Sequence, residues 1–506
     1  MGQYGPAQAV KNMNKKNICL LIIFLFILII RIPYVNNYVF ISDEAVFLSV
    51  ADSINRGQVI YKDNWDFKPP VLYLVFAAIL SIFPHSILTI KIFTIIISLL
   101  TCTMVFLISS EIFPGNTPLV ITFIYGIYAS NNDIIGLSSV CEVFTVLPVT
   151  IAIYMILKAM KTQSDSHRQC FLFLCGIAFG VAFFIKYNVL FEILLPLSYM
   201  FWLVLKRKIK VFDFLCIFAG GFAVFLILLF YLFYAGALPY FYETVVHLQY
   251  YFSKVAKPRM LNSISDTIFR KNIILLYLLA MTSCIYIIYK YRSSEGILMI
   301  LWAAGGFMGK YLANAYFMLL LPSFCTVSAY IVNYMLQNWR NLKLVSLIII
   351  IMFTINFSLI LIPHVQALAE LGNIIYRQGR WFDREYIENV GLYIQSHTNR
   401  DDCIYVVSDY GYRDLIYFIS NRRCCTRYPS FLTMIVPVPG GIEEDQKNSF
   451  ASHPPAYFIV WAEKIDYFNY ITSRYISYTG RKYDIVLQTE EPGTKNYIII
   501  YKLLKN

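Results

Sequence analysis

Charged residues are scarce in this chain of 506 residues, at 14% against 58% hydrophobic residues. A soluble domain carries about 25% charged residues, so the composition excludes an ordinary soluble protein and predicts that most of the surface faces lipid. The eleven cysteines and six histidines show no zinc-ligand spacing. The net charge of +12 does not indicate a nucleic-acid partner, because the basic residues gather at the ends of apolar runs, as orientation signals do.

Apolar runs divide most of the chain into candidate membrane spans, and no convincing internal repeat relates them. Several runs are shorter than about 20 residues, so their helices must extend into flanking polar sequence. The first run follows three lysines like a signal peptide, but it lacks a small-residue cleavage site, so we expect an uncleaved span. The eleven candidate spans are 18–30, 88–108, 119–130, 143–157, 171–185, 188–205, 211–234, 273–289, 297–309, 311–335 and 344–363.

The run 71–83 lies between Pro69-Pro70 and Pro84-His85, and its short length is typical of a re-entrant or interfacial helix. If it does not cross, the basic clusters between spans all fall on the side of the N-terminal lysines, as the positive-inside rule requires. We therefore predict an inside N-terminus and three outer segments, 31–70, 131–142 and 235–271. The basic clusters are Lys158/Lys161/Arg168, Lys206/Arg207/Lys208/Lys210, Lys290/Arg292 and Arg340/Lys343.

Residues 364–506 differ in character from the transmembrane domain predicted for residues 1–363. Strand and helix patterns alternate there, which predicts a small extracytoplasmic α/β domain. The expected elements are helices at 383–398 and 464–475 and strands at 403–407, 457–461 and 497–501. The sequence leaves open whether any two of Cys403, Cys424 and Cys425 form a disulfide.

The first outer loop places carboxylates and a lysine at the edge of the bilayer. Asp43 and Glu44 are expected in the first turn of a helix, and Lys68 precedes the next apolar run. Such acids are ordinary partners of a helix N-terminus, and such a lysine can be an interfacial anchor. The acids also suit a base that accepts a proton from a hydroxyl, and the lysine suits a cation that binds a phosphate. Together they predict the transfer of a group from a phosphate leaving group. Tyr61 and Asp63 lie in the polar segment between them.

Glu142 and Lys186 border other apolar runs on the predicted outer face. Glu142 can be an interfacial acid or a second carboxylate that converges on the site as an orienting group, a metal ligand or an acceptor contact. Lys186 can be an interfacial anchor or a substrate contact. The residue types alone do not decide between these roles.

The 235–271 loop combines aromatic residues such as Tyr250 with Lys254, Lys257 and Arg259. Outer loops should contain few basic residues, so this cluster departs from the topology rule and is explained by a bound phosphate beside a stacked sugar. Tyrosines of an interfacial belt would account for the aromatic residues alone. Two weaker candidates of the same kind, Lys310 and Tyr316, lie near another outer boundary.

Taken together, these motifs resemble membrane glycosyltransferases of the GT-C class. The similarity is greatest to bacterial relatives of the protein O-mannosyltransferases, the dolichyl-phosphate-mannose-protein mannosyltransferase-like family, and of the aminoarabinose lipid A transferase. It extends over most of residues 15–335, and the tail is similar to the small outer domain of these enzymes. The residues that carry it are Asp43-Glu44, Tyr61-x-Asp63, Lys68-Pro69-Pro70, Glu142, Gly176–Lys186, the aromatic loop and Tyr316-Phe317. Ala315 stands where relatives often have histidine.

The resemblance implies a sugar donor on a polyprenyl phosphate, and no nucleotide-sugar fingerprint is present. Asp43 would take the proton of an acceptor hydroxyl. The oxygen of that hydroxyl would attack the anomeric carbon and invert its configuration. Lys68, with Lys254, Lys257 or Arg259, would neutralise the departing phosphate. The acceptor can be a lipid such as lipid A, a glycan or a protein. No cofactor is certain, and a divalent metal remains open.

Two other classes of protein compete with a hexosyl- or pentosyltransferase. A lipid-sugar transporter should carry charges or broken helices at mid-membrane and two pseudo-repeated halves, whereas the charges here lie at one outer edge. A surface-polysaccharide ligase or polymerase would share the lipid-linked donor but build its outer site from a different loop pattern. The sequence therefore favours a transferase in the inner or plasma membrane.

Overall fold

The computed structural model of the chain describes residues 6–36, 42–247, 273–310, 317–370, 384–408, 413–429, 442–462, 465–490 and 497–504. The chain divides into two compact units. The helical unit comprises Met1–Asn37, Lys91–Leu228 and Lys257–Ile375, and the sheet unit comprises Tyr38–Ile90, Leu229–Ala256 and Tyr376–Asn506. The sheet unit thus joins the predicted C-terminal domain to the first outer loop.

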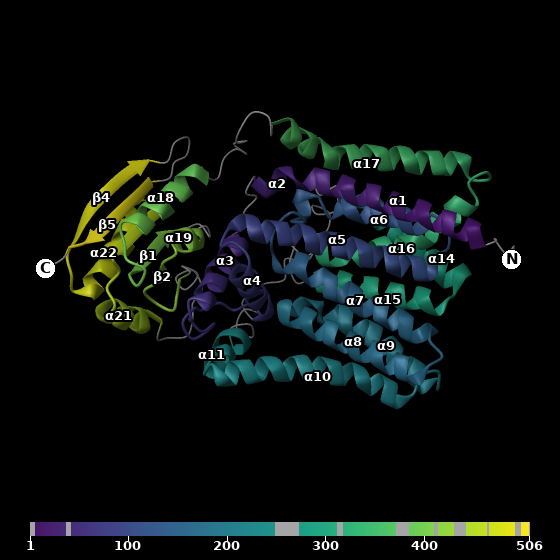
Figure 1. Cartoon of the computed structure of the whole chain (residues 1–506), viewed down its shortest axis with the longest axis horizontal. Helices are drawn as coiled ribbons and strands as arrows, with labels where there is room; N and C mark the ends of the chain where they lie inside the picture. Colours follow the sequence, from purple (N-terminus) through teal and green to yellow (C-terminus); the bar gives the residue numbers. More distant parts are fainter. Residues whose placement is uncertain are drawn as a thin grey trace. The chain divides into compact units, whose positions relative to one another are not determined.

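The helical unit is a bundle of long helices that run side by side (Figure 1). Inside it, α16 packs against α6, α7, α14 and α15, while α1 packs against α6 and α17. The helices of this unit are α1 (Pro6–Arg31), α2 (Pro33–Asn36), most of α5 (Ile87–Ile112), α6 (Thr117–Tyr128), α7 (Cys141–Lys161), α8 (Asp165–Ile185), α9 (Leu190–Leu205), most of α10 (Val211–Tyr234), α14 (Ile274–Tyr286), α15 (Ser294–Lys310), α16 (Phe317–Gln337) and α17 (Lys343–Glu370). Short turns of 3-10 or π-helix add η1 (Asn132–Ile134), η2 (Tyr187–Val189) and η4 (Ile287–Tyr291).

Within the described residues, eight helices are long and apolar enough to cross a membrane. They coincide with eight of the predicted spans. The other three predicted spans fall on α1 and on the shorter apolar helices α6 and α15. The chain is therefore a polytopic helical membrane protein, as its composition predicts.

Helices α8 and α10 approach each other closely through glycines. A Cβ atom on Gly176 would lie 1.9 Å from the carbonyl oxygen of Ile217, and one on Gly220 would lie 2.0 Å from that of Phe173. Small residues allow such backbone contact between membrane helices, where packing rather than the hydrophobic effect holds helices together. Any larger side chain at either position would force the two helices apart.

The sheet unit contains a five-stranded mixed sheet of order β2-β1-β3-β5-β4. Strand β1 pairs in parallel with β2 and β3, and β5 pairs antiparallel with β3 and β4. All six residues of β1 are buried, as expected for an interior strand covered on both faces. The strands are β1 (Cys403–Ser408), β2 (Arg423–Cys424), β3 (Tyr457–Ala462), β4 (Tyr483–Glu490) and β5 (Tyr497–Leu503).

Helices cover both faces of this sheet. Phe450 of α21 contacts Phe458, whereas Tyr393 of α18 contacts the adjacent residue Tyr457, and successive side chains of a strand point to opposite faces. The helices are α18 (Arg384–Ser396), α19 (Arg413–Ser420), α21 (Ile442–Ser452) and α22 (Ile465–Thr479). The predicted small α/β domain is confirmed. The edge strand β4 and the helices α19 and α21 were not among the expected elements.

A disulfide joins Cys403 of β1 to Cys425, which follows β2 directly. The neighbouring Cys424 is a free thiol. Burial raises the pKa of this thiol, which keeps it protonated and makes it a poor nucleophile toward the adjacent disulfide. The pairing that the sequence left open is therefore Cys403 with Cys425.

The first outer loop also belongs to the sheet unit. It contains α3 (Ser42–Asn55) and α4 (Val71–Ile82), and α3 packs against both α4 and α19. The ring of His85 stacks on Phe418 at 4.3 Å, and the amide of Trp65 donates to the carbonyl of Arg427. Helix α4 is about 18 Å long at 1.5 Å per residue, well short of a hydrocarbon core of about 30 Å. Its place in this unit agrees with a helix that does not cross, whereas its length alone does not distinguish it from α6, which also has 12 residues.

Candidate active site

Asp43 lies in the first turn of α3, where the sequence predicts it. The helix forms because Phe47, Val50 and Ala51 recur at helical spacing and are buried, and it is followed by Gly57 with a positive φ of 85°. The side chain of Asp43 is 44% exposed, whereas Glu44 is buried. Of the two acids, Asp43 is therefore the one that a substrate can reach.

The ammonium of Lys68 lies between two carboxylates and two aromatic rings. Its Nζ atom is 3.3 Å from Oδ1 of Asp43 and 3.6 Å from Oδ2 of Asp66. It also lies 5.1 Å from the ring centre of Phe47 and 5.3 Å from that of Phe67, within the range of cation–π attraction. The structure thus brings together Asp43 and Lys68, which are predicted as base and phosphate-binding cation.

The backbone that carries Lys68 is fixed by its own loop. Tyr61 is buried, and its hydroxyl donates to the carbonyl of Lys68 over 2.7 Å. Asp66 accepts hydrogen bonds from the amides of Phe67 and Lys68, at 2.6 and 3.3 Å. Asp63 accepts from the amide of Val59 at 2.7 Å. These contacts hold the loop in shape around the lysine, and the predicted substrate contacts of Tyr61 and Asp63 remain predictions.

Glu142 and Lys186 form a second pair, within the helical unit. Glu142 is buried in the first turn of α7, and Lys186 follows the last residue of α8. Because α7 and α8 pack as antiparallel neighbours, these two ends meet, and Nζ of Lys186 lies 2.7 Å from Oε1 of Glu142. The sequence predicts both residues on one face of the membrane but not their contact.

Of the remaining predicted site residues, the described part of the chain includes Lys310. Lys310 ends α15, and a Cβ atom on the adjacent Gly309 would lie 2.7 Å from the carbonyl oxygen of Asn188, so this helix end lies close to the segment that follows Lys186. Tyr250, Lys254, Lys257, Arg259 and Tyr316 lie outside the described residues.

A buried arginine that was not among the predicted site residues organises the turn that follows α6. The guanidinium of Arg31 donates to the hydroxyls of Ser98 and Ser130, at 2.9 and 3.0 Å, and to the carbonyl of Ala129. His364 of α17 contacts the carbonyl of Ser130 at 2.9 Å. A signal for Arg31 exists in the sequence, because this basic residue ends the first span on the predicted outer face, against the positive-inside rule.

The Asp43–Lys68 pair offers an exposed carboxylate and a fixed cation that lie 3.3 Å apart. A carboxylate can accept a proton from a hydroxyl, and a held ammonium can stabilise an anion. Among the described residues, no group of three or more His, Cys, Asp or Glu side chains could hold a metal ion.

The fold is that of the GT-C glycosyltransferase class. Residues 67–234 match the family described as dolichyl-phosphate-mannose-protein mannosyltransferase. The matched segment begins one residue before Lys68 and includes both Glu142 and Lys186. This segment, about a third of the chain, is similar to the membrane glycosyltransferases of that family, as the motifs predict. No curated protein sequence matches it.

Solved structures of two proteins share this fold over nearly the whole of this chain. ArnT from Cupriavidus metallidurans bound to undecaprenyl phosphate is 10% identical, with a TM-score of 0.63 over 96% of this chain and 98% of that one. The Archaeoglobus fulgidus oligosaccharyltransferase in complex with Zn and sulfate is 15% identical, with a TM-score of 0.57 over 96% of this chain and 72% of that one. The same oligosaccharyltransferase tethered to an acceptor peptide with the NVT sequon gives the same TM-score and identity, over 96% and 74% of the two chains.

Proposed function

We propose that this protein transfers a hexose or pentose from a polyprenyl-phosphate-linked donor to an acceptor hydroxyl at the outer face of the membrane. The observation that carries the proposal is the Asp43–Lys68 contact, a reachable carboxylate beside a cation held by two rings. The family match that begins at residue 67 and the ArnT structure with undecaprenyl phosphate support a polyprenyl phosphate as the donor lipid. The acceptor is a lipid, a glycan or a protein.

The proposed reaction inverts the anomeric carbon in a single displacement. The donor phosphate first takes over the ammonium of Lys68, which frees Asp43 from its ion pair. Asp43 then accepts the proton of the acceptor hydroxyl while that oxygen forms a bond to the anomeric carbon. The bond from the anomeric carbon to the phosphate oxygen breaks, and polyprenyl phosphate leaves with the electron pair, its charge neutralised by Lys68.

The remaining predicted residues take supporting roles in this proposal. Lys254, Lys257 and Arg259 add positive charge for the donor phosphate, and Tyr61, Asp63, Tyr250, Lys310 and Tyr316 contact substrate. Glu142, paired with Lys186, supplies a second carboxylate that orients the acceptor. The buried position of Glu142 and the bond to Lys186 keep that carboxylate in one place.

The test of the function compares cells with and without the gene. Mass spectrometry of surface glycolipids, glycans and glycoproteins should detect one class of molecule that loses the mass of one sugar. Expression of the wild-type gene should restore that mass, and a gene with Asp43→Asn should not. A surface polysaccharide that loses entire chains rather than single sugars would point to the ligase or polymerase alternative. Accumulation of unused donor on the inner leaflet would point to a transporter.

The proposed topology places the sheet unit outside the cytoplasm. The charge distribution supports this orientation, and so does the Cys403–Cys425 disulfide, because disulfides persist in oxidising compartments. A reporter enzyme that is active only outside the cytoplasm should be active when it is fused to the C-terminus. Since Asp43 and Lys68 belong to the same compact unit as that terminus, a cytoplasmic signal would place the proposed site on the wrong face.

A further inference from the structure

A basic cavity lies at the end of the helical unit where α8 and α10 begin and α9 ends. Its volume is about 460 Å³, and its lining includes Arg168, Arg207, Lys208 and Lys210. All four belong to the basic clusters that mark the predicted inner face. Such a cavity is large enough for a phosphate diester with its glycerol.

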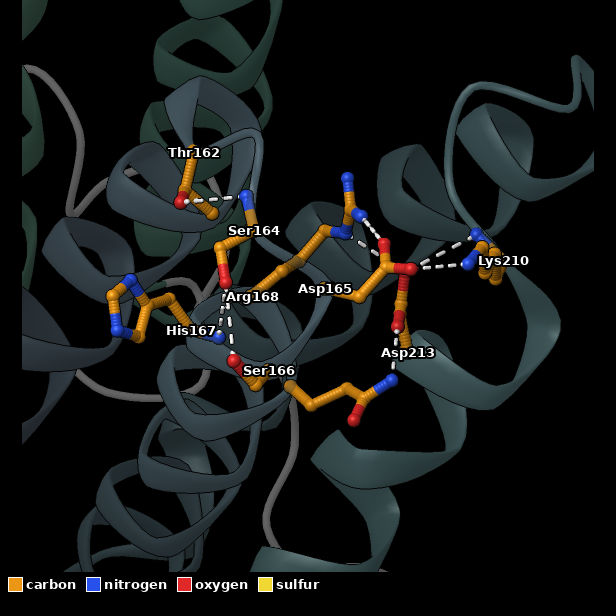
Figure 2. Close-up of polar contacts among 9 residues, drawn as sticks. Thr162, Ser164, Asp165, Ser166, His167, Arg168, Lys210 and Asp213 are labelled. Carbon is orange, nitrogen blue, oxygen red and sulfur yellow. Dashed lines mark hydrogen bonds and ion pairs between the residues drawn. The ribbon is translucent and has the colours of Figure 1, made fainter.

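One wall of the cavity is fixed by an ion-pair network (Figure 2). Arg168 contacts Asp165 and donates through Nε to Asp213 over 2.9 Å, and Lys210 contacts Asp165. Asp213 is fully buried and also accepts from the side-chain Nε2 of Gln169 at 3.1 Å. The two aspartates therefore offset Arg168 and Lys210, and the network ties the start of α8 to the start of α10.

Arg207 and Lys208 bring charge that the network does not offset. Among the described residues, neither has an ion-pair partner, and both side chains are exposed. The inner end of α9 thus adds two unbalanced cations to the cavity. An anion is the ligand that this arrangement would attract.

Arg207 occupies a backbone position that favours glycine. Its φ is 55°, and the amides of Arg207 and Lys208 close the end of α9 on the carbonyls of Val204 and Leu203. In this type of helix ending the left-handed residue is usually glycine, because a Cβ atom there is unfavourable. An arginine at this position sacrifices local stability and keeps a charge at the rim of the cavity.

Apolar side chains beside the cavity are exposed. Trp202 and Leu205 of α9 and Phe212 and Leu215 of α10 are all exposed, at 42%, 64%, 64% and 53%. A soluble anion would make no contact with these apolar side chains, whereas the acyl chains of a phospholipid would pack against them. Basic pockets between membrane helices on the inner face are suited to anionic headgroups.

We propose that this cavity binds the headgroup of an anionic phospholipid of the inner leaflet, with Arg207 and Lys208 on the phosphate and the acyl chains along the exposed ends of α9 and α10. The bound lipid would bridge these two ends and the start of α8. This site is independent of the sugar-transfer proposal, since it involves none of the residues of that proposal.

The test uses the full-length chain purified in detergent and titrated with dioleoyl phosphatidylglycerol, with bound lipid counted by native mass spectrometry. Arg207→Gly removes the charge and relieves the backbone, so it separates binding from folding. Arg292→Gly is the matched control. It also removes an arginine with a positive φ, 45°, at the end of another helix on the predicted inner face, and Arg292 does not line the cavity.

We expect Arg207→Gly to weaken phosphatidylglycerol binding about 5-fold, since each basic residue near an anionic lipid surface contributes about 1 kcal/mol. With Lys208→Gln added, the loss should be about 25-fold. Arg292→Gly should bind as the wild type does, and the melting temperature of Arg207→Gly should not fall. Dioleoyl phosphatidylcholine should bind weakly to all variants.

Two results would overturn the proposal. One is equal phosphatidylglycerol binding by the wild type and the Arg207→Gly/Lys208→Gln variant. The other is displacement of phosphatidylglycerol by inorganic phosphate or glycerol phosphate at matched concentration, because it would make the cavity a site for soluble anions.

Discussion

Asp43→Asn should lower kcat by about 10²–10⁴-fold while donor binding stays close to that of the wild type. Asparagine keeps the size and polarity of the side chain but cannot accept a proton. The variant should fold, because Asp43 is half-exposed and its pair with Lys68 contributes only about 0–1 kcal/mol to stability. Lys68 also keeps Asp66 as a partner at 3.6 Å. The measurement is single-turnover sugar transfer by purified enzyme, with the melting temperature as the check on folding.

Glu44→Gln is the matched control for Asp43→Asn. Glu44 is one residue further along α3, turned by about 100°, and its side chain is buried. We therefore expect a change in stability rather than in the chemical step. Folded Asp43→Asn enzyme that transfers sugar at the wild-type rate would contradict the assignment and move the base to Glu44 or Glu142.

Lys68→Ala should weaken donor binding by about 10- to 150-fold, because a hydrogen bond to a charged group contributes about 1.5–3 kcal/mol. The effect should appear in the Kd for the polyprenyl-phosphate donor, measured by titration of the purified enzyme. Lys68→Arg should restore part of the affinity, since it returns the positive charge.

Lys68→Met separates charge from packing. Methionine keeps an unbranched apolar stem next to Phe47 and Phe67 but carries no charge, so its donor affinity should resemble that of Lys68→Ala. Its melting temperature should stay nearer to that of the wild type. Wild-type donor affinity in both uncharged variants would reduce Lys68 to an interfacial anchor.

Local patterns predict much of this fold. Long apolar runs correspond to the helices of the helical unit, since a helix that crosses lipid must satisfy its own backbone groups. The apolar stripe from Phe47 to Ala51 predicts α3, and the buried run at 403–407 predicts β1. Each of these signals depends on residues close in the sequence. The edge strand β4 carries no such signal, because Asp484 and Gln488 interrupt its apolar residues and residues 484–488 are all exposed.

The contacts of the candidate site depend on tertiary packing and are less predictable. Asp43 and Lys68 were expected to act together, but the loop that brings them to 3.3 Å is closed by Asp66 and Tyr61. The Glu142–Lys186 pair requires that α7 and α8 be antiparallel neighbours. Arg31 offers one signal, a basic residue on the predicted outer face, whereas its serine partners lie 67 and 99 residues away. The spacing of these residues along the sequence does not show that they are in contact in the fold.

The most direct test of the central claim follows both products of one reaction catalysed by the purified enzyme. The enzyme is supplied with a polyprenyl-phosphate sugar that is labelled in the sugar and in the lipid, together with a membrane extract that contains the acceptor. The account predicts equal amounts of released polyprenyl phosphate and sugar-modified acceptor, with inverted anomeric configuration in the product and neither product from Asp43→Asn. Retained configuration, or sugar transfer without release of polyprenyl phosphate, would contradict it.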